Sequence, residues 1–300
     1  MKEDNVFELS TEKVNQNTLG IDTASTGDIL HMMNEEDQKV AEAVRLVIPK
    51  IEEVVDKVVA SISQGGRLIY MGAGTSGRLG VLDAVECPPT FSVDSDVVVG
   101  LIAGGEKAFV KAVEGAEDDE GLGVSDLKGI ELTPKDTVVG IAASGRTPYV
   151  IGGLKYAREL GATAVALSCN TGSKISAEAG LAIEVDAGPE ALTGSTRLKA
   201  GTAQKMVLNM ISTASMIKLG KAYGNLMVDV NISNYKLEQR AIGIIESITG
   251  ADKETAAATL KKANNEVKPS IVMITLGCGY EEAKNRLEDA NGYVRLAIEK

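Results

Sequence analysis

The stretch MGAGTSGR (residues 71–78) decides the fold, because it joins an apolar run to a helical segment through a glycine-rich turn. The apolar run is RLIYMG (residues 67–72), and the glycines at 72, 74 and 77 form a G-x-G-x-x-G pattern. Small residues let the backbone N–H groups of a helix N-terminus approach an anion closely. The stretch therefore predicts a strand, a loop and a helix with an anion site, for either a dinucleotide or a single phosphate.

Similar apolar runs recur along the chain, each bounded by turn residues. They are VVVGLIAGG (97–105), TVVGIAASG (137–145), TAVALSCNTG (163–172) and LAIEVDAG (181–188). Helical segments such as TPYVIGGLKYARELG (147–161) lie between them, and helical spacing also runs from about Glu35 to Ser63. This alternation is typical of a parallel sheet covered by helices on both faces. We expect an α/β sandwich over residues 1–235.

Residues 197–221, RLKAGTAQKMVLNMISTASMIKLGK, read as a long helix that is apolar around most of its circumference. Such a helix is buried within the fold or against a second subunit. A homodimer would explain the apolar surface of this helix. After Asn234 only short helical segments separated by glycines or a proline follow, which predicts a small helical C-terminal domain over residues 236–300.

The composition excludes several classes of function. The chain of 300 residues has a formal net charge of −11, and only 3% of its residues are aromatic. An acidic surface repels nucleic acids and anionic membranes, and few aromatic side chains are present for base stacking. Neither partner is expected.

Three cysteines, Cys87, Cys169 and Cys278, are widely spaced, so neither a disulfide framework nor a thiolate metal site is indicated. The polar N-terminus MKEDNVFELSTEK lacks the pattern of a signal peptide, and no apolar run approaches the length of a membrane span. A cytoplasmic protein is expected.

The dinucleotide interpretation needs an acidic residue at the end of the second strand, to bind the ribose hydroxyls. That strand ends instead in Ile102, Ala103, Gly104 and Gly105, with Glu106 just beyond. The first loop carries Thr75, Ser76 and Arg78 beside Gly74 and Gly77. Hydroxyl and guanidinium groups are phosphate ligands, so a single phosphate is favoured over NAD.

Two further stretches also carry residues that can bind an anion. Ser144, Gly145, Arg146 and Thr147 follow a later strand, and Pro148 suits the first turn of the next helix. Ser195, Thr196, Arg197 and Lys199 stand at the start of the long helix, where the helix dipole favours a second anionic group. Each stretch alone is equally compatible with an ordinary helix start that binds no ligand. Two serine-bearing loops together favour a site for a single phosphate over two helix starts that bind no ligand.

Four segments carry a resemblance to a known family: MGAGTSGRLGVLDAVECPPT, GLIAGGEKAFVKAVEGAEDD, GIAASGRTPYV and TGSTRLKAGTAQKMVLNMISTASMIKLGKAYGNLMVDV. Together they closely resemble N-acetylmuramic acid 6-phosphate etherases, and STEKVNQNTLGIDTAST near the N-terminus is similar to theirs. The resemblance implies a sugar isomerase (SIS) type three-layer sandwich with a small all-helical C-terminal unit. It also implies a dimer that cleaves the D-lactyl ether with water, releasing N-acetylglucosamine 6-phosphate and D-lactate in cell-wall sugar recycling.

The family's catalytic acids fall on Glu86 in DAVECPP and on Glu117 in EGAED. Val85 is a departure, since a small residue stands there in many relatives, and it puts in question only the packing beside Glu86. An unactivated ether resists water, whereas elimination is easier once the sugar opens to its aldehyde and the C2 proton becomes acidic. A base and an acid that titrate near neutrality suffice, and carboxylates serve when burial raises their pKa. No cofactor and no metal are expected.

The resemblance favours Glu86 as the acid that protonates the departing lactate and Glu117 as the base at C2, although either carboxylate could act twice. A straight helix from Gly77 to Glu86 would advance about 13 Å, which is long for one substrate. Glu86 would then serve the other subunit's site. The only histidine, His31, precedes the first expected helix and is assigned no chemistry.

Three competing functions stay open. An amino-sugar-phosphate isomerase would use the same loops and a glutamate base. A regulatory sugar-phosphate-binding protein would have no chemical reason to keep the pair Glu86 and Glu117. A nicotinamide dehydrogenase is disfavoured by the missing acid.

Overall fold

The computed structural model describes residues 8–111, 113–232 and 234–299 of the chain. The chain divides into two compact units. One comprises Met1–Val85 and Asp96–Ser212, and the other comprises Glu86–Ser95 and Thr213–Lys300. The second unit thus includes residues 213–235, which the sequence analysis placed in the first domain.

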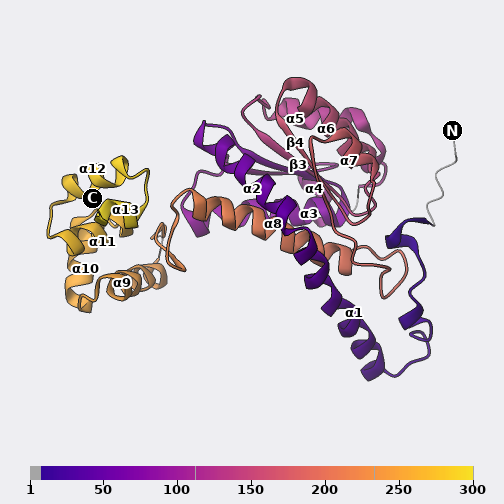
Figure 1. Ribbon diagram of the computed structural model, residues 1–300, viewed down its shortest axis with the longest axis horizontal. Helices are drawn as coiled ribbons and strands as arrows, with labels where there is room; N and C mark the ends of the chain where they lie inside the picture. Colours follow the sequence, from indigo (N-terminus) through magenta and orange to yellow (C-terminus); the bar gives the residue numbers. More distant parts are fainter. Residues whose placement is uncertain (1–7, 112, 233, 300) are drawn as a thin grey trace. The chain divides into compact units, whose positions relative to one another are not determined.

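The first unit is built on one parallel sheet with the strand order β2-β1-β3-β4-β5 (Figure 1). Its strands are β1 (Leu68–Gly72), β2 (Val98–Ile102), β3 (Thr137–Ala142), β4 (Thr163–Ser168) and β5 (Leu181–Glu184). Each strand lies within one of the five apolar runs, and all four strand pairs are parallel. The predicted parallel α/β sheet is confirmed.

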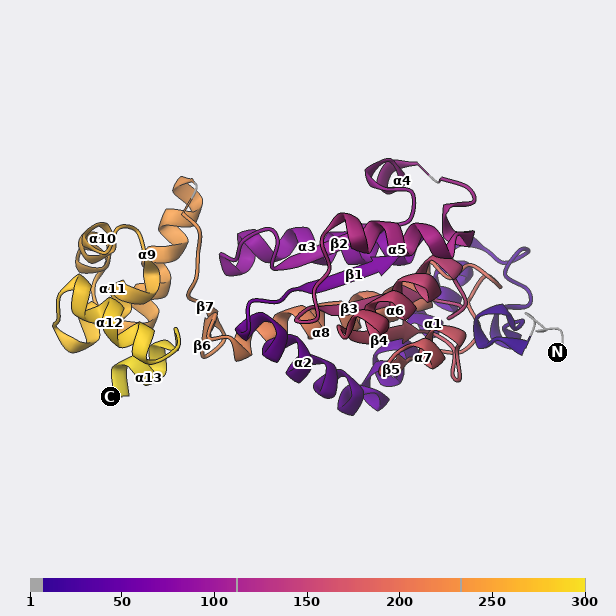
Figure 2. The ribbon, with the colours of Figure 1, turned by 90° about the horizontal axis from the view of Figure 1, so that it is seen from above.

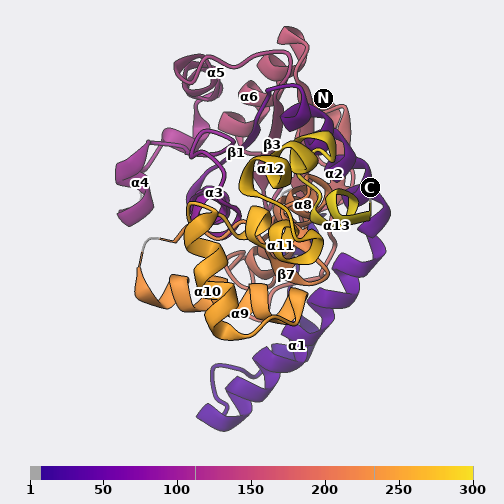
Figure 3. The ribbon, with the colours of Figure 1, turned by 90° about the vertical axis from the view of Figure 1, so that its left-hand side faces the viewer.

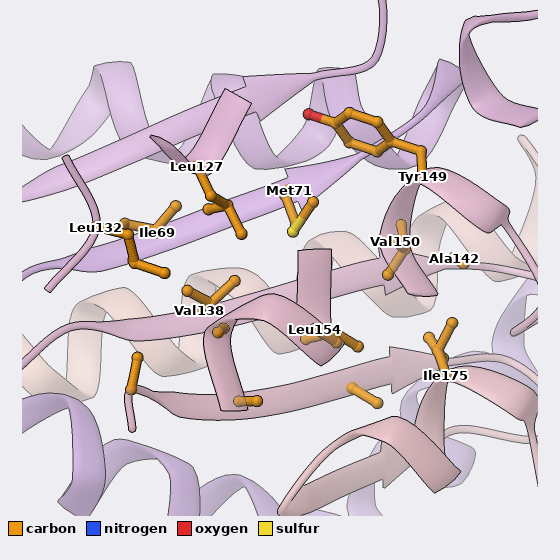
Figure 4. Packing of buried hydrophobic residues seen from close by; sticks show 14 of the residues in the cluster. Ile69, Met71, Leu127, Leu132, Val138, Ala142, Tyr149, Val150, Leu154 and Ile175 are labelled. Atoms are coloured by element: carbon orange, nitrogen blue, oxygen red, sulfur yellow. The ribbon is translucent and has the colours of Figure 1, made fainter. Parts of the chain in front are cut away.

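Helices cover both faces of this sheet (Figures 1 and 2). One face carries α5 (Glu120–Gly129), α6 (Pro148–Leu160) and α7 (Lys174–Glu178), and the other carries α2 (Ile48–Ser63), α3 (Gly74–Phe91) and α8 (Lys199–Lys218). Successive side chains of a strand point to opposite faces, so β1 contributes to both layers. Met71 packs with Leu127 and Leu154 in the core on the α5–α6 side (Figure 4). The hydroxyl of Tyr70 instead donates to the Leu208 carbonyl of α8, at 3.4 Å.

The first helical region consists of two helices, α1 (Thr26–Leu46) and α2, so the helical spacing from Glu35 to Ser63 is confirmed, with a break at Val47. Pro49 lies in the first turn of α2. A proline ring clashes with the carbonyl four residues earlier in a continuous helix but fits a first turn. The helix also begins earlier than expected, because Ser25 caps it by accepting the N–H of Asp28. His31 therefore lies within α1.

The second unit contains a bundle of short helices (Figure 3). They are α9 (Tyr235–Thr249), α10 (Lys253–Lys262), α11 (Val267–Leu276), α12 (Tyr280–Asp289) and α13 (Val294–Glu299), and a short hairpin of β6 (Ala222–Tyr223) and β7 (Leu226–Met227) precedes them. Ile245, Leu260 and Ile271 belong to a core of their own. The predicted run of short helices after Asn234 is confirmed.

Across the described ranges, no helix has both the length and the apolar character needed to span a membrane.

Candidate functional site

The two serine-bearing loops leave adjacent strands at the point where the chain changes direction across the sheet. From β1 the chain crosses to β2 at one edge, whereas from β3 it proceeds to β4 on the other side. Gly72 at the end of β1 pairs with Ile141 near the end of β3. In open α/β sheets, ligands bind outside the carboxyl ends of the strands at such a switch point. Strand order therefore brings residues 73–78 and 143–147 to one edge of the sheet.

The first loop depends on two of its glycines. Gly74 has φ +52°, a conformation that favours glycine. A Cβ added at Gly77 would lie 2.5 Å from the Gly72 carbonyl oxygen, so only glycine lets α3 begin this close to β1. The Ser76 hydroxyl is buried and donates to Gln204 Oε1 of α8 at 2.9 Å. The first turn of α3 consequently lies beside the second turn of α8.

Arg78 holds the short helix α4 (Glu106–Val110) to α3. Its Nε donates to the Phe109 carbonyl at 2.9 Å, and its Nη2 donates to the Ala108 carbonyl at 2.8 Å. Carbonyl groups at a helix C-terminus carry no intrahelical partner, and a guanidinium suits them. These bonds direct Arg78 toward the segment that leads to Glu117, and its role as a phosphate ligand stays a prediction.

A cavity of about 150 Å³ brings the first loop and Glu117 together. Its lining comprises Ala73, Gly74, Arg78, Ala103, Ala108, Val113, Glu114 and Glu117. Glu117 lies in the single-turn helix η4 (Ala116–Asp118), and Gly115 before it has φ +78°. The structure thus places one predicted acid beside the predicted phosphate loop. Glu114 was not singled out from the sequence, because its run EGAEDDEG has the pattern of solvated surface charges.

The second loop also depends on a glycine with positive φ. Gly145 has φ +70°, and an added Cβ would lie 2.3 Å from the Cβ of Ser173. The Arg146 N–H donates to Ser144 Oγ at 3.3 Å. Thr147 stands at the N-cap of α6 without a capping hydrogen bond from its side chain, and Pro148 occupies the first turn as expected. Ser144, Arg146 and Thr147 are all partly accessible.

In the third predicted group of residues, the structure separates Lys199 from the other three. Ser195 and Thr196 are half-buried and Arg197 is exposed, all just before α8. Lys199 is instead fully buried, and its Nζ donates to Glu36 Oε2 at 2.7 Å and to the Ala187 carbonyl at 2.9 Å. The expectation that Lys199 binds a substrate anion is therefore not supported, because Glu36 already neutralises its charge.

Glu190 occupies the start of α8, where the sequence had suggested a bound anion. Its carboxylate accepts the N–H groups of Lys199 and Ala200 at 2.8 and 3.0 Å. Burial raises the pKa of Glu190, although the two backbone N–H groups and the charge of Lys199 act in the opposite direction. The helix N-terminus is thus satisfied by the protein's own carboxylate.

Glu86 lies on α3, nine residues after Gly77, and the helical rise puts it about 13 Å along the axis from the end of the phosphate loop. It does not line the cavity that contains Glu117. The helix continues through Pro88 and Pro89 to Phe91, so the helical segment assumed from the sequence is confirmed. Val85 is 58% exposed, and the departure at this position does not disturb the core.

Within the described ranges, no cluster of three or more His, Cys, Asp and Glu side chains could hold a metal ion.

Three families match successive parts of the chain. Residues 50–158 match the Glucokinase regulatory protein N-terminal SIS domain, and residues 127–214 match the SIS domain. Residues 224–270 match the C-terminal lid domain of glucokinase regulatory protein. The expected SIS-type sandwich is thereby confirmed.

Curated relatives match almost the whole chain. An N-acetylmuramic acid 6-phosphate etherase from Geobacillus sp. (strain WCH70) is 62% identical over 291 residues, covering 97% of this chain and 99% of the relative. The protein of that name from Bacillus subtilis (strain 168) is 56% identical over 295 residues, covering 98% and 97%.

Among solved structures, a phosphoheptose isomerase from Neisseria gonorrhoeae is 16% identical, with a TM-score of 0.47 over 63% of this chain and 98% of the other. A phosphoheptose isomerase from Francisella tularensis is 14% identical, with a TM-score of 0.47 over 63% and 99%.

Proposed function

The chain belongs to the N-acetylmuramic acid 6-phosphate etherase family, and we propose that Glu117 and Glu86 carry out the elimination and hydration steps of its reaction. The enzyme is a lyase that acts on N-acetylmuramic acid 6-phosphate. We propose further that water replaces the D-lactyl ether at C3 and that the products are N-acetylglucosamine 6-phosphate and D-lactate.

The observation that carries this proposal is the shared cavity at the switch point. Glu117 lines it together with Gly74 and Arg78 of the phosphate loop. A phosphate bound by residues 74–77 and 144–147 would fix one end of an open-chain sugar, leaving its reacting carbons to extend along the strand edge. A sugar chain that is fixed at its phosphate is then long enough for its C2 proton to reach a carboxylate beside the phosphate loop.

The reaction is assigned in four steps. The ring opens to the aldehyde, which makes the C2 proton acidic. Glu117 removes that proton, and the electron pair forms the C2–C3 double bond as the C3–O bond breaks. Glu86 protonates the departing oxygen, releasing lactate. Water then adds at C3 and a proton returns to C2, which restores the saturated aldehyde. Both roles are general acid–base catalysis by carboxyl groups, so the proposed steps need no cofactor.

The second and third groups of residues have binding roles in this proposal. Ser144 and Thr147 present accessible hydroxyls at the start of α6, as expected of a phosphate cradle. Ser195, Thr196 and Arg197 would bind the carboxylate of the lactyl group, the second anionic group of the substrate. Lys199 has no place in this binding set, because its ammonium is paired with Glu36.

We assign the active form to a homodimer in the bacterial cytosol. On α3, the face that carries Glu86 also exposes Leu82 and Val85, which are 44% and 58% exposed. Large apolar side chains on one helix face suit coverage by a second copy. In the dimer, Glu86 would serve the site of the partner subunit, since it lies about 13 Å along α3 from Gly77 of its own loop. Three free cysteines suit a reducing compartment.

The test is incubation of the purified protein with N-acetylmuramic acid 6-phosphate in deuterated water. We expect D-lactate to be released and deuterium to appear at C2 of N-acetylglucosamine 6-phosphate. Lactate release without deuterium at C2 would overturn the elimination route. Exchange at C2 with a ketose product and no lactate would assign an isomerase, and neither lactate nor exchange would assign a binding protein.

A further inference from the structure

The segment Ser10–Thr18, here called the N-terminal strap, is polar in sequence and yet partly buried. Its two 3-10 helices are η2 (Ser10–Glu12) and η3 (Gln16–Thr18). Thr11, Asn15 and Thr18 are only 2%, 4% and 6% exposed. Buried polar side chains are costly unless they are hydrogen-bonded, so the partners of these three residues show what the strap does.

One set of partners lies in the chain directly before Ser195. The Asn15 side-chain amide donates to the Pro189 carbonyl at 3.0 Å, and the Thr18 hydroxyl donates to the Ala191 carbonyl at 2.8 Å. These are long-range bonds from side chain to backbone, and they bind a segment that is neither helix nor strand. The strap therefore fixes the path of residues 189–191, which leads into the substrate loop 195–197.

A second set of partners reaches the other loop. The side-chain amide of Asn170, just after β4, donates to Thr11 Oγ1 at 3.1 Å and to the Ala143 carbonyl at 3.0 Å. Ala143 immediately precedes Ser144. One amide group thus joins the strap to the start of the second serine-bearing loop, and both of its N–H donors are used for this purpose.

A third connection runs through α1. Asn17 Nδ2 donates to Glu36 Oε1 at 2.8 Å, and the other carboxylate oxygen of Glu36 binds the buried ammonium of Lys199. Lys199 is the first residue of α8. The strap is therefore bonded to both sides of the loop that carries Ser195, Thr196 and Arg197.

We propose that Thr11, Asn15 and Thr18 are positioning residues for the substrate and set the relative placement of the two anion-binding loops. Asn15 and Thr18 act through the Pro189 and Ala191 carbonyls, and Thr11 acts through the Asn170 amide. This inference rests on the proposed function of those loops. None of the three residues is assigned a contact with the substrate. Their contribution is preorganisation, since loops held in the binding geometry lose less conformational entropy when the substrate binds.

The chain offers matched variants for the test. Thr18→Val removes the hydroxyl that binds Ala191 and leaves a side chain of similar shape, whereas Thr18→Ser retains the hydroxyl. Asn15→Asp keeps the oxygen that caps Asn17 but loses the donor to Pro189. Thr23→Val is the control, because the Thr23 hydroxyl is exposed and donates only to the local Gly20 carbonyl.

For the full-length enzyme at 25 °C, we expect Thr18→Val to raise KM by about threefold to tenfold, the effect of one lost hydrogen bond. Asn15→Asp should raise KM further, because it also places a carboxylate at a 4% exposed position against the Pro189 carbonyl. We expect kcat to stay within about twofold of wild type, because neither residue belongs to the acid–base pair. The inhibition constant of D-lactate should rise in parallel, because the path of residues 189–191 leads into the loop assigned to the lactyl carboxylate. Thr18→Ser should return KM to near wild type, and Thr23→Val should leave it unchanged.

A lower melting temperature with unchanged KM and unchanged D-lactate inhibition would overturn the proposal, since it would make the strap purely structural. Calorimetric binding of D-lactate and of inorganic phosphate separates this failure from that of the proposed function. If wild type released no lactate but bound D-lactate, Thr18→Val should still bind it more weakly than Thr23→Val, and equal binding would overturn the strap's role. Absence of turnover and of binding of both anions in wild type would overturn both proposals.

Discussion

The Lys199 ammonium lies 2.7 Å from Glu36 Oε2, and the two side chains are 1% and 3% exposed. The pair joins α1 to the first residue of α8, two elements separated by more than half of the chain. Removing one partner of a buried ion pair leaves an uncompensated charge, which costs more than the pair itself contributes.

Lys199→Met should therefore lower the free energy of unfolding by about 3–5 kcal/mol. Without Lys199, the buried Glu36 carboxylate would keep only the half-exposed Lys39 and Asn17 as partners, so its charge would be incompletely compensated. The double variant Glu36→Gln, Lys199→Met should therefore be more stable than Lys199→Met alone. Urea denaturation measures both. Lys50→Met is the control, because the pair of Lys50 with Glu53 is about half-exposed and its loss should change stability by about 0.5 kcal/mol or less. Equal stabilities of Lys199→Met and Lys50→Met would contradict the prediction.

The same carboxylate makes stability depend on acid pH. Burial by itself would raise the pKa of Glu36, but hydrogen bonds from Lys199, Lys39 and Asn17 outweigh it and lower the pKa from 4.5 to about 2. A group whose pKa is depressed in the folded state stabilises the fold above its unfolded pKa. Its contribution should be complete above about pH 4.5 and should be lost as the pH falls toward 2.

Thermal melting between pH 2 and pH 6, compared between wild type and Glu36→Gln, measures this contribution. Asp136 and Glu184 also have lowered pKa values, since hydrogen bonds to Arg67 and to the start of α7 outweigh their burial, so wild type alone would not isolate Glu36. The difference in melting temperature between the two proteins should shrink as the pH falls. A difference that stays constant with pH would count against the assigned role of Glu36.

The strands were predictable because burial on both faces of a parallel sheet leaves an unbroken apolar run in the sequence. The break at Val47 is signalled by Pro49, and the early start of α1 is signalled by Ser25 three residues before Asp28. The apolar stripe that continues across the break masks both signals. Local capping and proline chemistry decide the boundaries there.

The burial of Lys199 and Glu36 could not be predicted, because both residues lie in stretches with the appearance of solvated charges. Their pairing depends on a contact between distant segments. Glu190 was not predictable either, because nine residues separate it from Lys199 and a capping carboxylate normally stands directly before the helix. The strand order that brings the two serine-bearing loops together was also not readable from the runs, whose spacing is compatible with several orders.

The second loop should be intolerant of a side chain at Gly145. Gly145→Ala would place a Cβ 2.3 Å from the Cβ of Ser173 at a φ of +70°. Gly172→Ala is the matched control, because Gly172 has φ +63° but open space around it. We expect the control to cost about 1–2 kcal/mol from backbone strain. Gly145→Ala should cost about 1–3 kcal/mol more, from overpacking.

Gly145→Ala should also raise the KM for N-acetylmuramic acid 6-phosphate, because the loop that presents Ser144 and Thr147 is displaced. Urea denaturation and steady-state kinetics of the two alanine variants give both quantities. Equal KM values for the two variants would show that the geometry at Gly145 does not matter for substrate binding.

Arg78→Lys should lower kcat/KM by about tenfold to a hundredfold, because an ammonium cannot reproduce the two bonds from one planar group to the Ala108 and Phe109 carbonyls. The end of α4 would then be less well held, and with it the segment that carries Glu117. Arg45→Lys is the control, since the Arg45 guanidinium binds the exposed Glu42. Steady-state kinetics and the inhibition constant of phosphate are measured together. An unchanged inhibition constant would indicate a shifted Glu117, whereas a raised one would indicate a weakened phosphate site. Wild-type kcat/KM in Arg78→Lys would contradict the positioning role.

The two proposed catalytic carboxylates should differ in deuterated water. Glu117→Gln should lose both lactate release and deuterium exchange at C2, because the base acts first, whereas Glu86→Gln should retain slow exchange while releasing little lactate.

Mixing the two inactive variants then tests whether Glu86 acts across the dimer. If it does, half of the sites in a mixed dimer carry neither substitution and half carry both, so mixed dimers should recover about half of the wild-type activity per dimer. If both carboxylates acted within one chain, every site would carry one substitution and no activity would return. Refolding or coexpression would form the mixed dimers, and size-exclusion chromatography with mass detection would establish that dimers are present.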